Sequence, residues 1–402
     1  MAVNSLCSYH RESLISTSLL LLKIIVVLRI LVLMNGWRNK NARGGDYRTL
    51  RVLRNWKEEH RISLILPRLG FEFAKKLLPD LNSIYLSSNE LEETESTTAF
   101  VRAYLFRSMK SLFFTNEQDQ DIIIASSHLL YDILPAVILR RKFKSKLVVY
   151  VHHVLHSYRT YKQGMWISIS LLTEKISLFL CKKADLIFVY NDEVKKDLIR
   201  EGFQTHKILI TGNGVEHEFI DSVKMKIHEF DACYCGALDK MKGVYDLLDV
   251  WEIVLRRFPK SKLVIIGQGP EYDRLLRIIR KKGLERNILL KGYLPEEQKI
   301  SAMKSSKLFI FPSYEEGWGI SITEAMACGL AVVCYDLEAY KVFGNSIVRI
   351  EIANKQAMAK VVTDFLNDKS KLECAALRAK EGTKDLSWDN IASGEMKEII
   401  KN

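Results

Sequence analysis

The feature that most constrains this chain is a regular alternation of two kinds of segment. From Arg29 onward, short runs rich in β-branched residues alternate with longer runs whose apolar residues recur at helical spacing. This order is typical of β-α-β units, which build parallel sheets covered by helices. We therefore expect an α/β protein with doubly wound, Rossmann-like sheets.

The alternation forms two series that meet near Thr211–Ser222, and 402 residues suffice for two domains of ordinary size. In doubly wound sheets, ligands bind beyond the carboxyl ends of the strands, so two facing domains would form a cleft. We expect an N-terminal domain over residues 29–212 and a second domain from residue 213.

The expected elements follow from these runs. Strands are predicted at Arg29–Asn35, Ile62–Pro67, Ser83–Leu86, Asp121–Ala125, Lys146–Val151, Asp185–Val189, Lys207–Ile210, Ala232–Cys235, Lys262–Ile266, Ile288–Leu290, Lys307–Phe311 and Ala331–Cys334. Helices are predicted at Asp46–Glu58, Tyr131–Lys142, Asn191–Glu201, Gly243–Arg257, Glu271–Lys282, Glu296–Lys304, Ile320–Cys328 and Lys355–Leu366. Asn191 is expected to cap its helix, and Leu86–Thr98 is expected to be a mobile acidic loop.

Cysteine usage argues against a disulfide scaffold. The seven cysteines are scattered, without a C-x-x-C pair or a histidine cluster at zinc spacing. Cys233 and Cys235 are the one close pair, and their strand-like surroundings favour two buried thiols. We expect a reducing compartment and no structural metal.

The net charge of +12 is concentrated in the first half. Residues 1–212 carry 31 Lys and Arg against 20 Asp and Glu, whereas residues 213–402 carry 29 against 28. A solvated surface, an anionic membrane surface and an anionic acceptor are all consistent with this asymmetry. Nucleic acid is disfavoured, because no DNA- or RNA-binding motif is present.

The segment Leu14–Met34 has about the length of a membrane span, but it contains Lys23 and Arg29. Its second half also has the pattern of a buried strand, and the same residues cannot belong both to a membrane span and to a strand of a sheet. No small-residue cleavage site follows, which argues against a removable signal peptide. Three interpretations of residues 1–28 therefore stay open: an apolar extension, a membrane anchor, or residues added by an upstream start codon.

Two glutamates bracket the most flexible turn of the second half. In EEGWGISITEAMACGL, Glu316 precedes Gly317, Trp318 and Gly319, and a helix is expected from Ile320, with Glu324 about one turn inside. Free N–H groups at a helix start suit phosphate, and glycines let a ligand approach the backbone. The carboxylates would hold hydroxyls on either side, although an acidic first turn is also common in ordinary helices.

This stretch resembles the E-x7-E signature of glycosyltransferase family 4, a retaining group with the GT-B fold. Further segments resemble family motifs in the same order and together span nearly all the chain from Arg29. These are Asn213-Gly214-Val215-Glu216, Gly236-Ala237-Leu238 with Lys242-Gly243, Ile266-Gly267-Gln268-Gly269-Pro270-Glu271, and Leu386-Ser387-Trp388-Asp389. The resemblance implies that the second domain ends near residue 385 and that a final helix, 386–402, crosses back to the first domain.

The resemblance also implies roles for single residues. Glu316 would contact the donor sugar, and Glu324 would bind the nucleotide ribose. Gly317, Trp318, Gly319 and Ile320 would offer backbone amides to the sugar and pyrophosphate, Gly236, Gly267 and Gly269 would line the donor site, and Lys242 would neutralise the leaving pyrophosphate. No metal or other cofactor is implied. One position departs from the family pattern: Ala237 stands where an Arg is usual, which removes a bidentate pyrophosphate contact.

The N-terminal candidates lie at the ends of predicted strands. Gly44 and Gly45 follow the first strand and resemble the family's glycine loop near the acceptor, although a plain strand-to-helix turn fits equally. His152 and His153 follow Lys146–Val151 and would face the cleft. By resemblance His152 is the better candidate for a sugar contact, and His153 is placed on the acceptor side.

Met165–Lys183 has apolar residues at helical spacing and ends in two lysines. It is either a core helix of the first domain or a face that rests on a membrane, as a lipid-linked acceptor would require. The basic residues from Arg140 to Lys146 are either a solvated helix end or part of the same face.

The function expected is transfer of a sugar from a nucleotide-sugar to a glycan or lipid-linked acceptor, in the cytoplasm, with attachment to the inner membrane face left open. A nucleotide-sugar-binding protein and a GT-B-type epimerase remain alternatives. An NAD-dependent oxidoreductase is disfavoured, because the Gly267–Gly269 pair lacks a third glycine.

Overall fold

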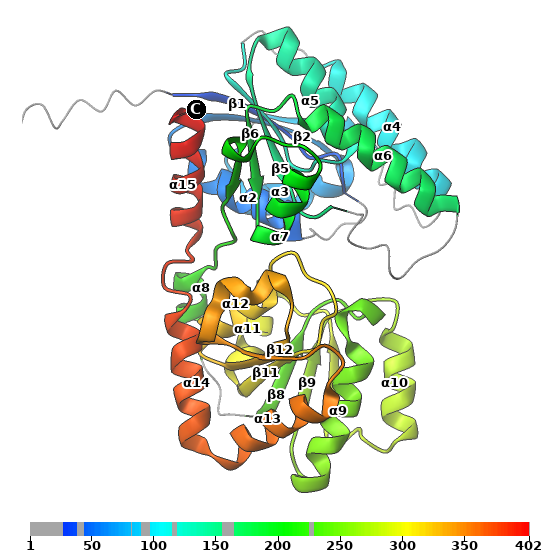
Figure 1. Ribbon diagram of the computed structural model, residues 1–402, viewed down its shortest axis with the longest axis vertical. Helices are drawn as coiled ribbons and strands as arrows, with labels where there is room; N and C mark the ends of the chain where they lie inside the picture. The colour runs from blue at the N-terminus through cyan, green and yellow to red at the C-terminus, as the bar shows by residue number, and fades with distance from the viewer. Residues whose placement is uncertain are drawn as a thin grey trace, which may run out of the picture.

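The computed structural model describes residues 27–37, 44–81, 83–89, 97–114, 119–154, 165–224 and 229–401. Two parallel sheets, each flanked by helices, lie one above the other in Figure 1. Residues 1–26, and with them most of the predicted N-terminal extension, lie outside the described residues.

The first sheet has seven parallel strands in the order β3-β2-β1-β4-β5-β6-β7. Strand β1 is central, and its residues Ile30 to Leu33 are completely buried, which confirms the strand interpretation of this apolar run. The order reverses between β1 and β4, so ligands are expected at this edge. The bounds are β1 (Arg29–Leu33), β2 (Arg61–Pro67), β3 (Ile84–Ser88), β4 (Ile122–Ala125), β5 (Lys146–Val151), β6 (Leu186–Val189) and β7 (Ile208–Ile210).

The second sheet has six parallel strands in the order β10-β9-β8-β11-β12-β13 and reverses between β8 and β11. Cys233 and Cys235 are buried in β8, as predicted, and burial raises the pKa of both thiols. The bounds are β8 (Phe230–Cys235), β9 (Leu263–Ile266), β10 (Ile288–Gly292), β11 (Ser306–Phe311), β12 (Ala331–Tyr335) and β13 (Val348–Ile350).

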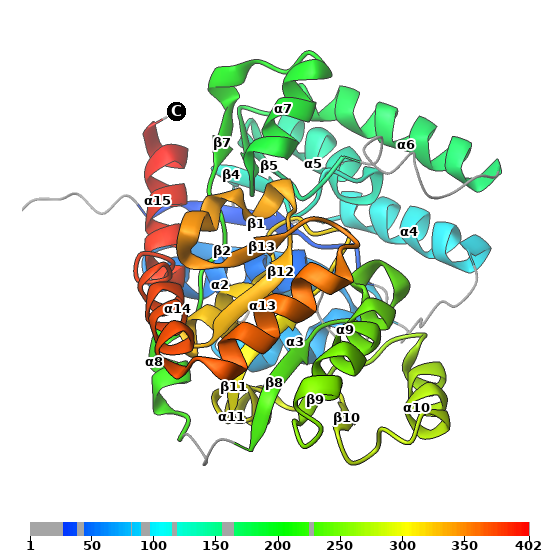
Figure 2. The same cartoon turned by 60° about the horizontal axis from the view of Figure 1, so that its bottom comes forward.

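The helices cover both faces of each sheet (Figures 1 and 2). In the N-terminal half they are α2 (Gly44–Trp56), α3 (Arg68–Leu77), α4 (Thr97–Leu112), α5 (Leu130–Phe143), α6 (Met165–Cys181) and α7 (Asp192–Arg200). In the C-terminal half they are α8 (His217–Ser222), α9 (Val244–Arg257), α10 (Tyr272–Lys281), α11 (Glu296–Lys304), α12 (Ile320–Ala327), α13 (Lys355–Asn367), α14 (Lys369–Glu381) and α15 (Trp388–Lys401).

Every predicted strand is present, with its ends within two residues of the prediction, and Asn191 caps α7 by accepting from the N–H of Val194 at 2.9 Å. No residue range was predicted for β13, α3, α4, α8 and α14. The predicted loop Leu86–Thr98 was partly wrong, because β3 continues to Ser88 and α4 begins at Thr97. Residues 90–96 of that loop lie outside the described residues.

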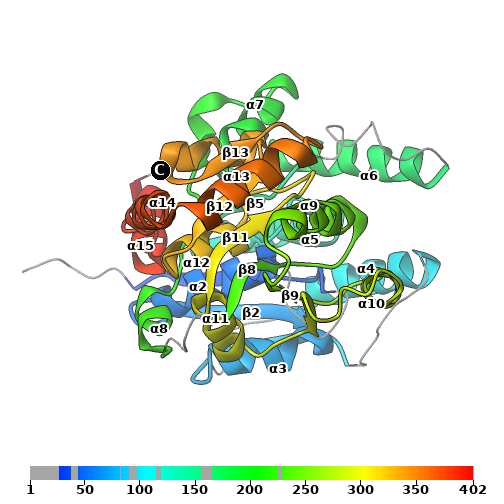
Figure 3. The ribbon, with the colours of Figure 1, turned by 90° about the horizontal axis from the view of Figure 1, so that it is seen from below.

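Helix α4 escaped prediction because its apolar residues occupy both its buried and its exposed side, so no hydrophobic stripe stands out. Figure 3 shows α4 and α6 extending past the first sheet in the same direction. Helix α3 was missed for another reason: it follows β2 directly, and its N-cap, Pro67, offers no side-chain capping bond.

A buried ion pair joins α2 to α15, the last helix, which runs alongside the first sheet in Figures 1 and 2. Arg48 Nη2 lies 2.5 Å from Glu395 Oε1, and neither side chain is exposed. Arg48 also donates to the carbonyl of Gly212 at 2.9 Å and to Thr211 Oγ1 at 2.8 Å. The hydroxyl of Tyr150 donates to the other oxygen of Glu395 at 2.6 Å. One guanidinium therefore holds α2, α15 and the connection between the sheets.

We expect Glu395→Leu to lower the free energy of unfolding by about 3–5 kcal/mol, because it leaves a buried guanidinium without its carboxylate. The double variant Arg48→Met/Glu395→Leu is expected to recover most of the loss. Urea denaturation followed by circular dichroism measures both. The control is Glu381→Leu, which removes the exposed partner of Lys384; a Glu395→Leu midpoint equal to that of the control would contradict the prediction.

Candidate active site

The loop between β11 and α12 carries the two glutamates singled out in the sequence. Gly319 precedes α12 with a φ of 91°, a left-handed conformation that favours glycine. A Cβ there would lie 2.9 Å from the ring of Tyr340, so a larger residue would also clash. This turn leaves the first N–H groups of α12 without a side-chain cap.

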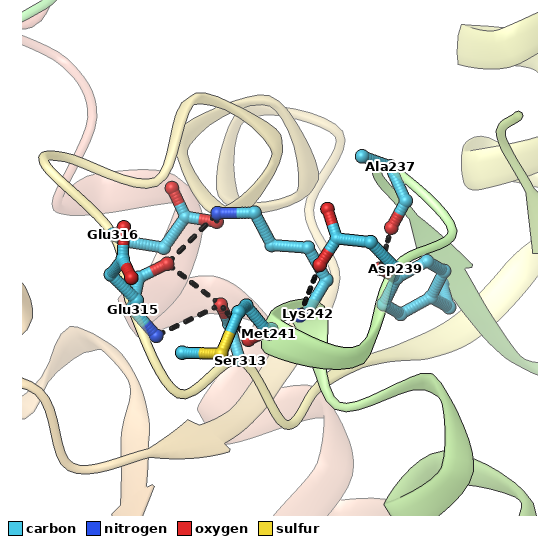
Figure 4. Close-up of polar contacts among 8 residues, drawn as sticks. Ala237, Asp239, Met241, Lys242, Ser313, Glu315 and Glu316 are labelled. Atoms are coloured by element: carbon cyan, nitrogen blue, oxygen red, sulfur yellow. Dashed lines mark hydrogen bonds and ion pairs between the residues drawn. The ribbon is translucent and has the colours of Figure 1, made fainter. Parts of the chain in front are cut away.

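Glu316 pairs with Lys242, as Figure 4 shows. Lys242 Nζ lies 2.7 Å from Glu316 Oε1 and donates to the carbonyl of Glu315 at 2.8 Å. Burial raises the pKa of Glu316, and the ammonium of Lys242 opposes that shift. The structure therefore brings together a carboxylate and a lysine that are 74 residues apart.

Close backbone packing makes this pairing possible. Lys242 ends a short 3-10 turn that Asp239 caps by accepting from the Lys242 N–H at 3.1 Å. The next residue, Gly243, is left-handed, and a Cβ on it would lie 1.8 Å from the carbonyl oxygen of Pro312. Only glycine permits that approach, so the loop after β8 rests directly on the loop after β11.

Glu324 has a cationic partner that the sequence did not indicate. Lys299 in α11 donates to both carboxylate oxygens of Glu324 at 2.8 Å and to Glu296 at 3.1 Å. Burial raises the pKa of Glu324 while Lys299 opposes the shift. Burial alone would lower the pKa of Lys299, but the attraction of Glu324 and its neighbours raises it overall. A lysine one helix away carries no local sequence signal for such a contact.

The three remaining donor-side glycines allow close loop packing. Gly267 has a φ of 143°, and a Cβ on it would lie 1.9 Å from the carbonyl oxygen of Gly236. A Cβ on Gly269 would lie 2.4 Å from the carbonyl oxygen of Leu238. Ala237, between these contacts, is exposed, and its carbonyl accepts from the Tyr234 hydroxyl at 3.0 Å.

Trp318 lies inside the turn and does not present its ring to solvent. Its side chain is 4% exposed, and its Nε1 donates to Thr323 Oγ1 at 3.0 Å. The ring packs against Gly212, where a Cβ would come within 2.8 Å of it. Trp318 thus anchors the glutamate loop to the connection between the sheets.

His152 faces this loop from the first sheet. Its Nε2 lies 2.7 Å from the carbonyl oxygen of Ser126, so Nε2 carries the proton and Nδ1 is an acceptor. Nδ1 has no hydrogen-bond partner among the described residues. A Cβ on Gly45 would lie 2.7 Å from the ring, and one on Gly317 would lie 3.3 Å from the carbonyl oxygen of His152.

Two more contacts close the junction of the two halves. Asn191 Nδ2 donates to the carbonyl of Gly317 at 2.5 Å, and a Cβ on Gly44 would lie 3.2 Å from Ile320. Asn191 was predicted only as a helix cap. Its side-chain oxygen makes that cap, and its side-chain nitrogen makes the contact with Gly317. His153 turns elsewhere: its ring meets that of His128 edge-on, with centroids 6.0 Å apart.

A small pocket beside Glu324 adds Tyr47 and Glu296, which the sequence did not single out, and brings in Glu216 and Trp388 from two of the family motifs. Tyr47, Glu216, Glu296 and Trp388 line it together with Glu324. Arg51 binds both of the first two: its guanidinium lies 2.6 Å from Glu216 Oε1 and donates to the Tyr47 hydroxyl at 2.7 Å. In the described ranges, no group of three or more His, Cys, Asp or Glu side chains has the spacing of a metal site.

We expect His152 to make the protein less stable in acid. Burial, with the neighbouring His153 and His128, lowers the pKa of His152 to about 3. An unfolded histidine binds a proton near pH 6.5, so the stability that the neutral ring retains above that pH is lost as the pH falls toward 3, by up to about 1.4 kcal/mol per pH unit.

In urea denaturation between pH 6.5 and 4, His152→Asn should therefore lose stability less steeply than the unmodified chain. The control is His206→Asn, since His206 is exposed. Equal slopes for the unmodified chain and His152→Asn would contradict the prediction.

Both halves of the chain match glycosyltransferase family models. Residues 42–219 match the family model described as Glycosyltransferase Family 4, and residues 217–382 match the model described as Glycosyl transferases group 1. Among curated relatives, the chain is 27% identical over 239 residues to the N-acetylgalactosamine-N,N'-diacetylbacillosaminyl-diphospho-undecaprenol 4-alpha-N-acetylgalactosaminyltransferase of Campylobacter jejuni, covering 58% of this chain and 64% of the relative.

It is also 29% identical over 165 residues to O-antigen chain mannosyltransferase B of Escherichia coli, covering 40% of this chain and 43% of the relative. The matches thus span between 43% and 64% of the length of these two relatives.

Solved structures share the fold. HepE of Anabaena in complex with UDP-glucose has a TM-score of 0.73 at 16% identity, over 93% of this chain and 99% of the other. Sucrose-phosphate synthase of Thermosynechococcus elongatus has a TM-score of 0.75 at 14% identity, over 93% and 98%. The two-sheet GT-B fold expected from the sequence is confirmed. With both halves matched in order, the chain belongs to glycosyltransferase family 4, within the group 1 glycosyltransferases.

Proposed function

We propose that the protein is a retaining glycosyltransferase that moves a sugar from a nucleotide-sugar to a glycan or lipid-linked acceptor. The observation that carries the proposal is the meeting of Glu316 and Lys242 from one sheet with His152 from the other, across the turn at Gly317. Both sides of the junction thus supply polar residues next to the turn at Gly317, which meets the backbone carbonyl of His152.

The developing charge of the leaving nucleotide is the main electrostatic demand of such a reaction. Lys242 supplies a cation, and the uncapped N–H groups at the start of α12 supply a partial positive charge. Without ligand, Lys242 pairs with Glu316. A bound pyrophosphate would compete for the ammonium and leave Glu316 to accept from the sugar hydroxyls.

His152 would accept a hydrogen bond from the donor sugar. Its Nε2 proton is committed to Ser126, so only Nδ1 is available, and a neutral ring is required. The lowered pKa of His152 keeps the ring neutral at physiological pH. The absence of a side chain at Gly45 leaves space against this ring.

Glu324 would accept from the ribose hydroxyls, with Lys299 keeping the carboxylate ionised and oriented. This arrangement leaves the pyrophosphate to Lys242, because Ala237 has no charge to offer. Lys240, which is exposed nearby, is a second cation within the same short turn.

The names of similar proteins suggest donor and acceptor classes. HepE of Anabaena was solved with UDP and with UDP-glucose, and the relative in Campylobacter jejuni is named for a diphospho-undecaprenol acceptor. We infer a UDP-sugar as the donor to test first and a lipid-linked or glycan acceptor. Attachment to the inner membrane face is part of this proposal. None of the helices in the described residues has both the length and the apolar character needed to cross a bilayer.

We expect UDP-sugars to raise the melting temperature of the protein more than GDP- and ADP-sugars do. Glu324→Ala and Lys299→Met should each weaken that binding about 10- to 100-fold, because a charged hydrogen bond is lost or a buried carboxylate is left unpaired. The control is Glu297→Ala, since Glu297 is exposed on the same helix as Lys299. Equal binding by Glu324→Ala and the control would place the nucleotide elsewhere.

Glu316→Gln should lower the rate of sugar transfer roughly 100-fold or more while changing donor binding far less, because it removes charge that acts on the transition state. Transfer is followed with a panel of lipid-linked and soluble acceptors. Wild-type turnover by Glu316→Gln would refute its catalytic role. Donor binding without turnover on any acceptor would favour the binding-protein alternative, and donor conversion without acceptor would favour an epimerase.

A further inference from the structure

The helices α4, α5 and α6 expose large apolar side chains that the packing of the chain does not explain. Phe113, directly after α4, is 77% exposed, and Phe179 in α6 is 65% exposed. The exposed apolar residues of this layer are Val101, Leu105, Phe106, Met109, Phe113, Ile138, Leu172, Ile176 and Phe179. We call them the outer face. Single exposed apolar residues are ordinary, but a set gathered on adjacent helices marks a surface that binds something.

These residues belong to one layer of adjacent helices. Helix α5 lies between α4 and α6 and packs against both. The opposite sides of these helices are buried, through residues such as Ala103 in α4, Ala136 in α5 and Leu178 in α6. The outer face therefore points away from the sheet, on the two helices that extend beyond it in Figures 2 and 3.

The charges of the layer identify the partner. Within α4, α5 and α6 the acidic residues are Asp132 and Glu174, and both are buried. The basic residues with exposed or half-exposed side chains are Arg102, Lys110, Arg140, Arg141, Lys142 and Lys175, and Lys182 and Lys183 follow α6 directly. Arg140 pairs with Asp185 at 2.8 Å, so the layer carries an excess of cations. A protein interface usually pairs charges of both signs more evenly, whereas apolar side chains beside such an excess of cations suit anionic headgroups over acyl chains.

We propose that the outer face docks onto an anionic lipid bilayer, with α4 and α6 lying in the plane of the interface. The apolar side chains enter the headgroup boundary, and the lysines and arginines contact the lipid phosphates. Of the two alternatives predicted for Met165–Lys183, the core helix is confirmed by Leu178 and Cys181, which are buried in the core. The membrane face is the alternative that we propose for the other side of the helix, where Leu172, Ile176 and Phe179 are exposed.

The outer face is connected to the candidate active site through α6. Glu174 Oε1 lies 3.4 Å from His128 Nε2, and the Cys181 thiol donates to the His128 carbonyl at 3.8 Å. The ring of His128 meets that of His153, next to His152. Docking would thus hold the acceptor side of the site close to the membrane. The docking deepens the membrane attachment that is part of the proposed function, and this use of the surface rests on that function.

The test is co-sedimentation of the full chain with vesicles of phosphatidylcholine, with and without phosphatidylglycerol. The outer-face variant replaces four residues with glutamine, and the control variant replaces four equally exposed apolar residues on other surfaces. The outer-face variant is Phe106→Gln/Met109→Gln/Phe113→Gln/Phe179→Gln, and the control is Tyr293→Gln/Val342→Gln/Leu377→Gln/Ile400→Gln.

We expect the unmodified chain and the control to bind phosphatidylglycerol vesicles, with affinity that falls as salt is added. The outer-face variant should bind at least about tenfold more weakly. UDP-sugar binding, measured in the same samples, should be equal in all three, so a failure of the docking and a failure of the proposed donor site are read separately.

Equal vesicle binding by the outer-face variant and the control would overturn the proposal. It would also be overturned if the unmodified chain ignored anionic vesicles but formed a dimer that the outer-face variant dissociates, because the surface would then be a protein interface.

Discussion

The buried ion pair between Arg48 and Glu395 holds together three parts of the chain that are far apart in sequence. Arg48 belongs to the first helix of the N-terminal half, Glu395 belongs to the last helix of the protein, and the same guanidinium binds Thr211 and Gly212 in the connection between the sheets. Desolvating both charges is costly unless the geometry satisfies them, and here Tyr150 fills the remaining carboxylate oxygen. The relative position of the two sheets, and hence of every group at their junction, depends on this arrangement.

At that junction the backbone is as important as the side chains. Trp318 packs the glutamate loop against Gly212, and Arg48 binds the carbonyl of Gly212 and the hydroxyl of the neighbouring Thr211. The ion pair and the site therefore share a support. Gly243 lets the loop that carries Lys242 rest on Pro312, and Gly45 and Gly317 let the two halves meet at His152. Where a Cβ would come within 3 Å of a neighbouring backbone atom, the neighbour cannot yield as a flexible side chain can. Of these glycines Gly243 meets that condition, and it therefore keeps Lys242 close to Glu316.

Much of the fold followed from local patterns. Strands of parallel sheets are short, apolar and bounded by turn residues, so all but β13 could be predicted, and the order of the motifs predicted two facing sheets. Helices were harder where their apolar residues lie on exposed surfaces. Helix α4 has no single hydrophobic stripe, because Phe106 and Met109 face outward while Ala103 and Tyr104 face the core. The property that hid α4 from prediction is the one that makes its outer side a docking surface.

By itself, the sequence determined which residues stand at the carboxyl ends of the strands and which glutamates flank the glycine turn, because these features depend only on spacing along one chain. It did not determine what each side chain meets. Only the tertiary structure paired Glu324 with Lys299, aimed the amide of Asn191 at Gly317, buried Trp318 and separated His152 from His153. The physical reason is that such contacts join elements from different parts of the chain. Their geometry is set by how helices and loops pack on the sheets, which no local pattern records.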